Sequence, residues 1–126
     1  PLSGRFGVPH GVACALLTPP VMAFNAIAAP ERLAEVGHIL GVPRDPAKTI
    51  YEQAYQAAEA FRALMQQLDL PLTLTELGTR GLARPAITEA DLDTLTADAM
   101  LARGMRGRNP RVNGERDIRA LYASVL

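Results

Sequence analysis

The 126-residue sequence has few of the features that mark several common classes of protein. It has one cysteine, no tryptophan, and 13 basic against 13 acidic residues, so its formal net charge is zero. A single cysteine excludes an internal disulfide framework and is compatible with a reducing cytosol. A chain without net charge lacks the positive field that attracts nucleic acid. We therefore expect no nucleic-acid partner.

Long apolar runs are also missing. The most apolar stretch covers residues 12–17 and 21–24, and Thr18-Pro19-Pro20 interrupts it. It falls short of the ~20 residues that a membrane-spanning helix needs. The chain begins at Pro1, and its first residues lack the basic, apolar and small-residue order of a signal peptide. We expect a cytoplasmic protein without a membrane partner, and a downstream piece of a longer polypeptide.

The sequence does contain helical periodicity, with apolar residues repeated at spacings of three and four. A first helix is expected over residues 11–28, which the Pro19-Pro20 pair should kink or divide. Pro30 suits the start of a second helix and Gly41 its left-handed end. The apolar stripe of this second helix is expected to be Leu33, Val36, Ile39 and Leu40.

The longest helix is expected after Asp45-Pro46, which repeats the start signal, and continues to Leu68 with one apolar face over about five turns. Residues 70–74 alternate like a strand, but Pro71 and the lack of a partner strand favour an extended link and one turn ending at Gly78.

Two more helices are expected in the second half. Thr88 and Asp91 form a capping box for a helix with the apolar face Leu92, Leu95, Ala99 and Ala102. After a loop over residues 104–112, Asn113 should cap a last helix that carries Ile118, Leu121, Tyr122 and Val125 on one side. The sequence therefore predicts an all-α domain over residues 1–126.

Five ordered landmarks add a family resemblance to this pattern. They are Pro9-His10-Gly11, Val21-Met22-Ala23-Phe24-Asn25, Ala29-Pro30-Glu31-Arg32, Leu70-Pro71-Leu72-Thr73-Leu74 with Glu76-Leu77-Gly78, and Asn109-Pro110-Arg111 followed by Asp117-Ile118. In this order and spacing they resemble the iron-containing (group III) alcohol dehydrogenases. The resemblance implies the helical C-terminal domain of the dehydroquinate synthase-like / iron-containing alcohol dehydrogenase fold.

The resemblance also implies an activity. In this family an N-terminal α/β half holds the nicotinamide dinucleotide and the C-terminal helical half holds a divalent metal. This sequence resembles only the second half, and it has no Gly-x-Gly-x-x-Gly turn. The implied function is the metal-binding half of an NAD(P)-dependent enzyme that interconverts alcohols with aldehydes or ketones. NAD or NADP would be bound mainly by the absent N-terminal domain, the 126 residues alone would be inactive, and the full-length protein would be a homo-oligomer.

His10 matches the family histidine that binds the catalytic metal together with an aspartate and two further histidines. The resemblance implies that those other ligands precede Pro1. Neutral imidazole suits Fe2+ and Zn2+ alike.

Three further residues are candidates for lining the pocket. Cys14, where many relatives carry asparagine, either faces the metal or packs as a small buried residue, and packing is favoured. Met105 occupies a position where relatives often carry a cysteine near the substrate, and equally suits a gap between helices. Phe6 precedes the His10 loop and either lines the cleft or packs in the core, and the core is favoured, because aromatic residues near a helix start are usually buried there.

The remaining polar features point to structural roles. His38 is expected at the surface. The basic cluster of Arg103, Arg106, Arg108 and Arg111 is interpreted as a solvated loop or an inter-domain salt-bridge surface, because no aromatic residues are interleaved with it.

Two alternative functions stay open. A maleylacetate reductase shares the implied fold, but that group usually shows Pro-His-Ala-Glu where this chain has Pro9-His10-Gly11-Val12. A non-catalytic helical interaction module is the other alternative.

Overall fold

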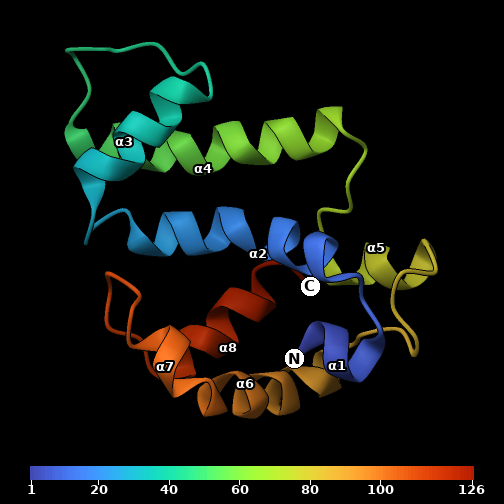
Figure 1. Cartoon of the computed structure of the whole chain (residues 1–126). Coiled ribbons are helices and arrows are strands. Elements are labelled where there is room, and N and C mark those ends of the chain that lie inside the picture. Colours follow the sequence, from blue (N-terminus) through green and yellow to red (C-terminus); the bar gives the residue numbers. More distant parts are fainter.

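The computed structural model describes residues 1–126 and contains helices without strands (Figure 1). The α-helices are α1 (Leu2–Phe6), α2 (His10–Asn25), α3 (Pro30–Ile39), α4 (Ile50–Gln67), α5 (Leu74–Thr79), α6 (Leu92–Leu101), α7 (Arg103–Arg106) and α8 (Glu115–Ala123). A 3-10 turn, η1 (Glu89–Asp91), leads into α6. The all-α prediction is confirmed. The short helix α1 was not predicted from the sequence.

Helix α2 is the central element. In Figure 1 the α3 and α4 pair lies on one side of it, and α1, α6, α7 and α8 lie on the other. The Pro19-Pro20 pair stays inside α2 and does not divide it, although each of the two prolines lacks the backbone N–H that a helix residue donates. The Thr18 hydroxyl donates to the Cys14 carbonyl over 2.8 Å in the turn just before these prolines. The helix ends at Asn25, three residues earlier than predicted.

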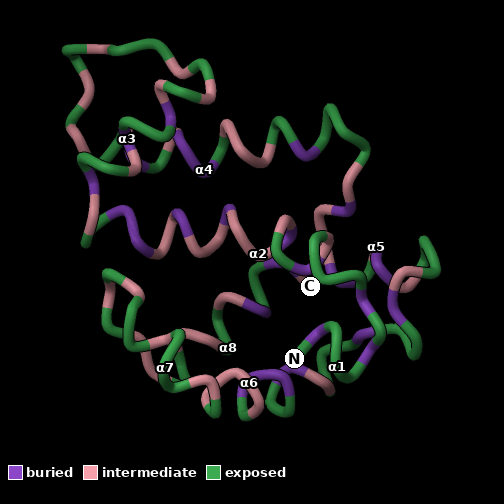
Figure 2. Tube along the Cα trace, viewed as in Figure 1, coloured by how far each residue is buried: buried purple, intermediate pink, exposed green.

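The main hydrophobic core lies where α1, α2, α5, α6 and α8 meet, and Figure 2 shows its buried segments. Its fully or almost fully buried large side chains are Leu2, Phe6, Val8, Leu16, Leu74, Leu77, Ile87, Leu92, Leu95, Tyr122 and Val125. The end of the chain is tied to α5, because the Leu74 N–H donates to the Val125 carbonyl over 2.6 Å. The core therefore joins the first and last helices of the chain.

Helices α3 and α4 approach closely through small residues. A β-carbon added to Gly37 would lie 3.3 Å from the Ala57 β-carbon. Ala34 and Gly37 are buried, whereas Val36 and Ile39 are exposed, Ile39 to 78%. The predicted apolar stripe of α3 is therefore wrong at Val36 and Ile39, because close helix packing places the small residues at the contact. Leu33 does pack inward, against the cluster of Met22, Ala57 and Ala58.

Two predicted helix starts also need correction. Asp45-Pro46 forms a turn in which the Asp45 carboxylate accepts from the Ala47 N–H over 2.9 Å, and α4 begins only after Thr49, which forms a capping box with Glu52. Asn113 does not cap α8, which begins after Gly114. Its side chain instead contacts Arg106 and Arg111. An asparagine already occupied by nearby loop residues is not available to the helix.

Other local predictions are confirmed. Asp91 accepts hydrogen bonds from the Thr88 N–H and hydroxyl over 2.8 and 2.9 Å, as expected of a capping box. Pro30 is at the first turn of α3, and Gly41 follows that helix with a φ of 96°. Residues 70–73 link α4 to the short helix α5 without forming a strand.

Candidate metal-binding site

His10 is the first residue of α2, and its side chain is exposed. Gly7 ends α1 with a φ of 66°, a conformation that favours glycine and lets the chain turn from α1 toward α2. The Arg84 N–H donates to the Phe6 carbonyl over 2.8 Å, which anchors the end of α1 to the loop between α5 and η1. The His10 imidazole therefore projects from the first turn of a helix and not from a loop.

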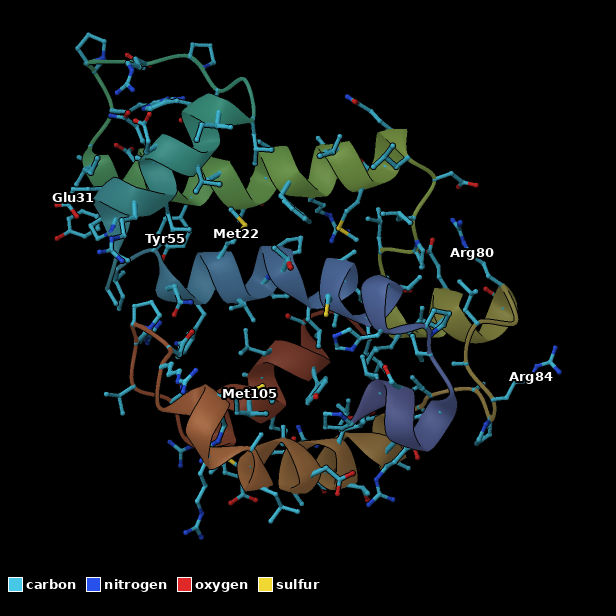
Figure 3. All side chains as sticks on the ribbon, in the orientation of Figure 1. Met22, Glu31, Tyr55, Arg80, Arg84 and Met105 are labelled. Carbon is cyan, nitrogen blue, oxygen red and sulfur yellow. The ribbon has the colours of Figure 1, made fainter.

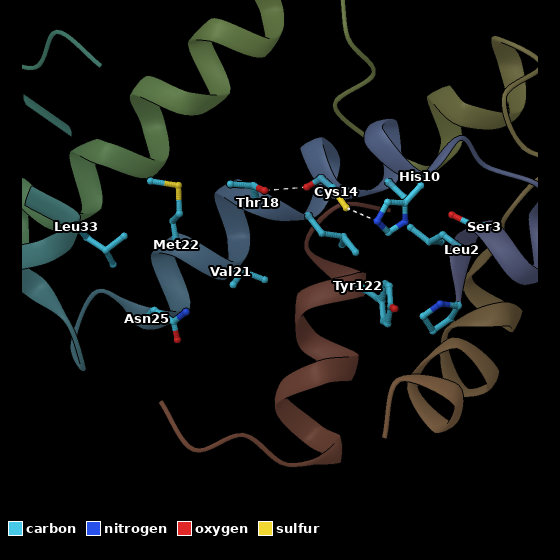
Figure 4. A pocket seen from close by; sticks show the side chains of 13 residues that line it. Leu2, Ser3, His10, Cys14, Thr18, Val21, Met22, Asn25, Leu33 and Tyr122 are labelled. Atoms are coloured by element: carbon cyan, nitrogen blue, oxygen red, sulfur yellow. Dashed lines mark hydrogen bonds between the residues drawn. The ribbon is translucent and has the colours of Figure 1, made fainter. Parts of the chain in front are cut away.

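The His10 side chain lines a hollow of about 390 Å³ that extends along α2 (Figure 4). Helix α2 contributes His10, Cys14 and Val21 to it, and α8 contributes Tyr122. Most of the wall is apolar, and no lysine, arginine, aspartate or glutamate lines it. The polar end of the hollow is formed by His10, Cys14 and Ser3.

Cys14 follows His10 by one helical turn, and both side chains face this hollow. The Cys14 sulfur lies 3.4 Å from His10 Nε2 (Figure 4). Cys14 is a free, exposed thiol. The favoured interpretation of Cys14 as a small buried packing residue is therefore wrong, because the face of α2 that carries it borders the hollow and not the core.

The structure does not bring Phe6 and Met105 to the same hollow. Phe6 is 5% exposed and belongs to the main core. Met105 lies on α7 (Figure 3) and is 77% exposed. It borders a second hollow of about 380 Å³ together with Phe24 and Asn109.

Tyr122 was predicted only as part of an apolar helix face, yet it lines the His10 hollow. Its side chain comes from α8 and is 4% exposed. Burial raises the pKa of the Tyr122 hydroxyl, and the charge of Asp98 adds to this effect. The phenol therefore stays neutral at ordinary pH. The sign of this position in the sequence was that Tyr122 carries a hydroxyl group among the apolar residues of the last helix.

A polar network fastens the loop before α8 to the end of α2. The side-chain amides of Asn25 and Asn109 hydrogen-bond to each other over 2.9 and 2.8 Å. Arg111 donates to the Phe24 carbonyl over 2.9 Å, and its guanidinium lies 4.0 Å from the centre of the Phe24 ring. Two members of the predicted basic cluster, Arg106 and Arg111, are thus held by protein groups.

The donor set near His10 is small. No group of three or more His, Cys, Asp or Glu side chains in the chain lies close enough to hold a metal ion. Imidazole and thiol are ligands that divalent transition metals accept, so His10 and Cys14 fit part of a metal site. The second histidine, His38, is half-buried on α3, and its Nδ1 lies 3.0 Å from the Val42 carbonyl.

No helix is both long and apolar enough to cross a membrane.

The amino-acid sequence is similar to those of a known dehydrogenase and a known reductase. The chain is 32% identical to the 1,3-propanediol dehydrogenase of Klebsiella pneumoniae over 125 residues, which is 99% of this chain and 30% of that protein. It is 33% identical to the lactaldehyde reductase of Escherichia coli K12 over 122 residues, 97% of this chain and 29% of that protein. The chain thus spans about 30% of the length of the curated relatives it matches.

Solved structures agree with the fold. The crystal structure of a 1,3-propanediol oxidoreductase superposes with a TM-score of 0.85 at 29% identity, covering 99% of this chain and 30% of that one. Residues 1–126 match the model of the C-terminal part of the Fe-containing alcohol dehydrogenase family. The helical fold and this match over every residue show that the chain belongs to the Fe-containing alcohol dehydrogenase family, as its C-terminal part.

Proposed function

We propose that residues 1–126 form the helical, metal-binding domain of an NAD(P)-dependent alcohol dehydrogenase that interconverts small alcohols with aldehydes or ketones. The observation that carries the proposal is the whole-chain family match combined with the position of His10. The Pro9-His10-Gly11 histidine begins α2 and faces a hollow of about 390 Å³.

His10 would hold the divalent metal, Fe2+ or Zn2+, through its imidazole. When bound, such a cation acts as a Lewis acid that polarises the substrate oxygen and favours hydride exchange with nicotinamide. The apolar wall, which includes Leu17 and Val21, would contact the hydrocarbon part of the substrate and exclude water from it. The neutral Tyr122 phenol borders the same space and can donate a hydrogen bond there.

The dinucleotide would be bound mainly by a separate N-terminal domain, which this chain does not include. The proposal is supported by the share of each relative that the chain covers, about 30%. The complete protein would be a cytoplasmic homo-oligomer, and the free Cys14 thiol is compatible with that reducing compartment.

A chimeric enzyme tests the proposal. The segment of the Klebsiella 1,3-propanediol dehydrogenase that matches this chain would be replaced by residues 1–126. We expect NAD(P)H-dependent reduction of short aldehydes, at least a hundredfold loss of activity and loss of bound metal in His10→Ala, and little change in His38→Ala. A folded chimera that binds the dinucleotide and reduces aldehydes equally well with and without His10 would contradict the role of His10.

A further inference from the structure

The pair formed by His10 and Cys14 has the geometry of two ligands on one cation. Their side chains project from successive turns of α2, and the Cys14 sulfur lies 3.4 Å from His10 Nε2. Zinc bonds of about 2.3 Å to sulfur and about 2.0–2.1 Å to nitrogen, at a tetrahedral angle, place the two ligand atoms about 3.5 Å apart. The observed separation therefore needs little adjustment to bind a metal ion.

Both ligand atoms are accessible from the same side. His10 and Cys14 are exposed, and both line the hollow of about 390 Å³. His10 is the hydrogen-bond partner of the Cys14 sulfur, whereas the Thr18 hydroxyl engages only the Cys14 carbonyl. The thiol is therefore free to exchange its contact with the imidazole for a bond to a cation in the hollow.

We propose that Cys14 is a second metal ligand from this chain and that, together with His10, it chelates a divalent cation of the zinc class. This inference rests on the proposed metal-binding role of His10 and deepens it. On binding, the S–H bond of Cys14 breaks, the proton passes to solvent, and the sulfur lone pair forms the bond to the cation. Thiolate is a softer ligand than imidazole or carboxylate, so it favours zinc over iron(II) at this position.

Cobalt(II) titration of the 126-residue chain tests the proposal, with cobalt as a spectroscopic substitute for zinc. A bond between thiolate and Co2+ gives an intense charge-transfer band in the near ultraviolet that nitrogen and oxygen ligands do not give. We expect this band in the unmodified chain and its complete loss in both Cys14→Ser and Cys14→Ala. Apparent affinity should fall at least tenfold in His10→Ala and stay within twofold in His38→Ala, the matched control at the other histidine.

Competition between metals and the reactivity of the thiol give a second readout. Zinc should displace cobalt, and the preference for zinc over Fe2+ should shrink at least tenfold in Cys14→Ser. Because Cys14 is the only thiol in the chain, its reaction with a disulfide reagent reports this site alone. Zinc should slow that reaction at least tenfold in the unmodified chain but not in His10→Ala. Circular dichroism of each variant checks that it remains helical.

The outcomes separate this inference from the proposed function. Cobalt binding without a charge-transfer band, lost in His10→Ala and kept in Cys14→Ala, would overturn the role of Cys14 and leave that of His10 intact. A thiol that reacts at the same rate with and without zinc would overturn it as well, and so would absence of cobalt binding by the folded chain. Activity of the chimeric enzyme tests the proposed function independently of these results.

Discussion

The side-chain amides of Asn25 and Asn109 pair with each other across 84 residues of sequence. Each amide donates to the carbonyl oxygen of the other, over 2.9 and 2.8 Å, and Asn25 is 8% exposed. Asn109 also donates to the Arg111 carbonyl over 2.7 Å. The pair thus joins the end of α2 to the loop before α8, so that two segments recognised separately in the sequence form one unit.

Replacing Asn109 by alanine should destabilise the fold by about 1–3 kcal/mol, because the buried Asn25 amide loses its partner. Urea unfolding followed by circular dichroism would measure the change. Arg108→Ala is the matched control, since Arg108 is exposed in the same loop. In the Asn25→Ala, Asn109→Ala double variant the loss should be smaller than the sum of the single losses. Additive losses would show that the two amides do not act as a pair.

Replacing Gly37 by leucine should lower the free energy of unfolding by about 1–3 kcal/mol. The β-carbon alone would lie 3.3 Å from the Ala57 β-carbon, so the rest of the leucine side chain has no room between α3 and α4. The same substitution at Gly4, where an added β-carbon meets nothing within 4 Å, should cost much less. Thermal unfolding of both variants gives the comparison. Equal unfolding temperatures would argue against the tight α3 and α4 contact.

Stability should depend on Asp98 at acidic pH. The hydrogen bond from Arg5 and the charge of that guanidinium lower the pKa of Asp98 in the folded protein. The folded state then holds this proton less tightly than the unfolded chain, whose aspartate pKa is about 3.9. The stabilisation is present above that value and is lost as the pH falls through the folded pKa.

Urea midpoints measured from pH 2 to pH 7 would test this dependence. Asp98→Asn should flatten the acidic part of the profile and lower stability near neutral pH. Glu59→Gln, which removes a carboxylate without an ion pair, serves as the control. An Asp98→Asn profile parallel to that of the unmodified protein would exclude the Arg5 contact as a source of the pH dependence.

The 126-residue chain by itself should not oxidise alcohols, because it holds too few metal ligands and matches only about 30% of the length of the dehydrogenase from Klebsiella. The assay combines NAD or NADP, iron or zinc, and short alcohols, and a blank with metal alone sets the background. Turnover above that background, abolished in His10→Ala, would mean that these residues suffice for catalysis.

The sequence by itself determined most of the helices, because their signals are local. Pro30 at a helix start, Gly41 after a helix end and the Thr88 and Asp91 capping box all act within a few residues. The same holds for the His10 and Cys14 spacing, since one helical turn places residues four apart on one face. The family resemblance, carried by short ordered motifs, was equally accessible and is confirmed by the match over residues 1–126.

Tertiary structure decided which of these local features are buried, exposed or joined. Periodicity predicted Val36 and Ile39 at the contact of α3, but close approach to α4 selected Ala34 and Gly37 instead. The exposure of Cys14 and the contact of Asn25 with Asn109 depend on where α8 and its preceding loop pack against α2. The way these elements pack depends on many weak contacts between residues that are far apart in the sequence, so it cannot be predicted from any short segment.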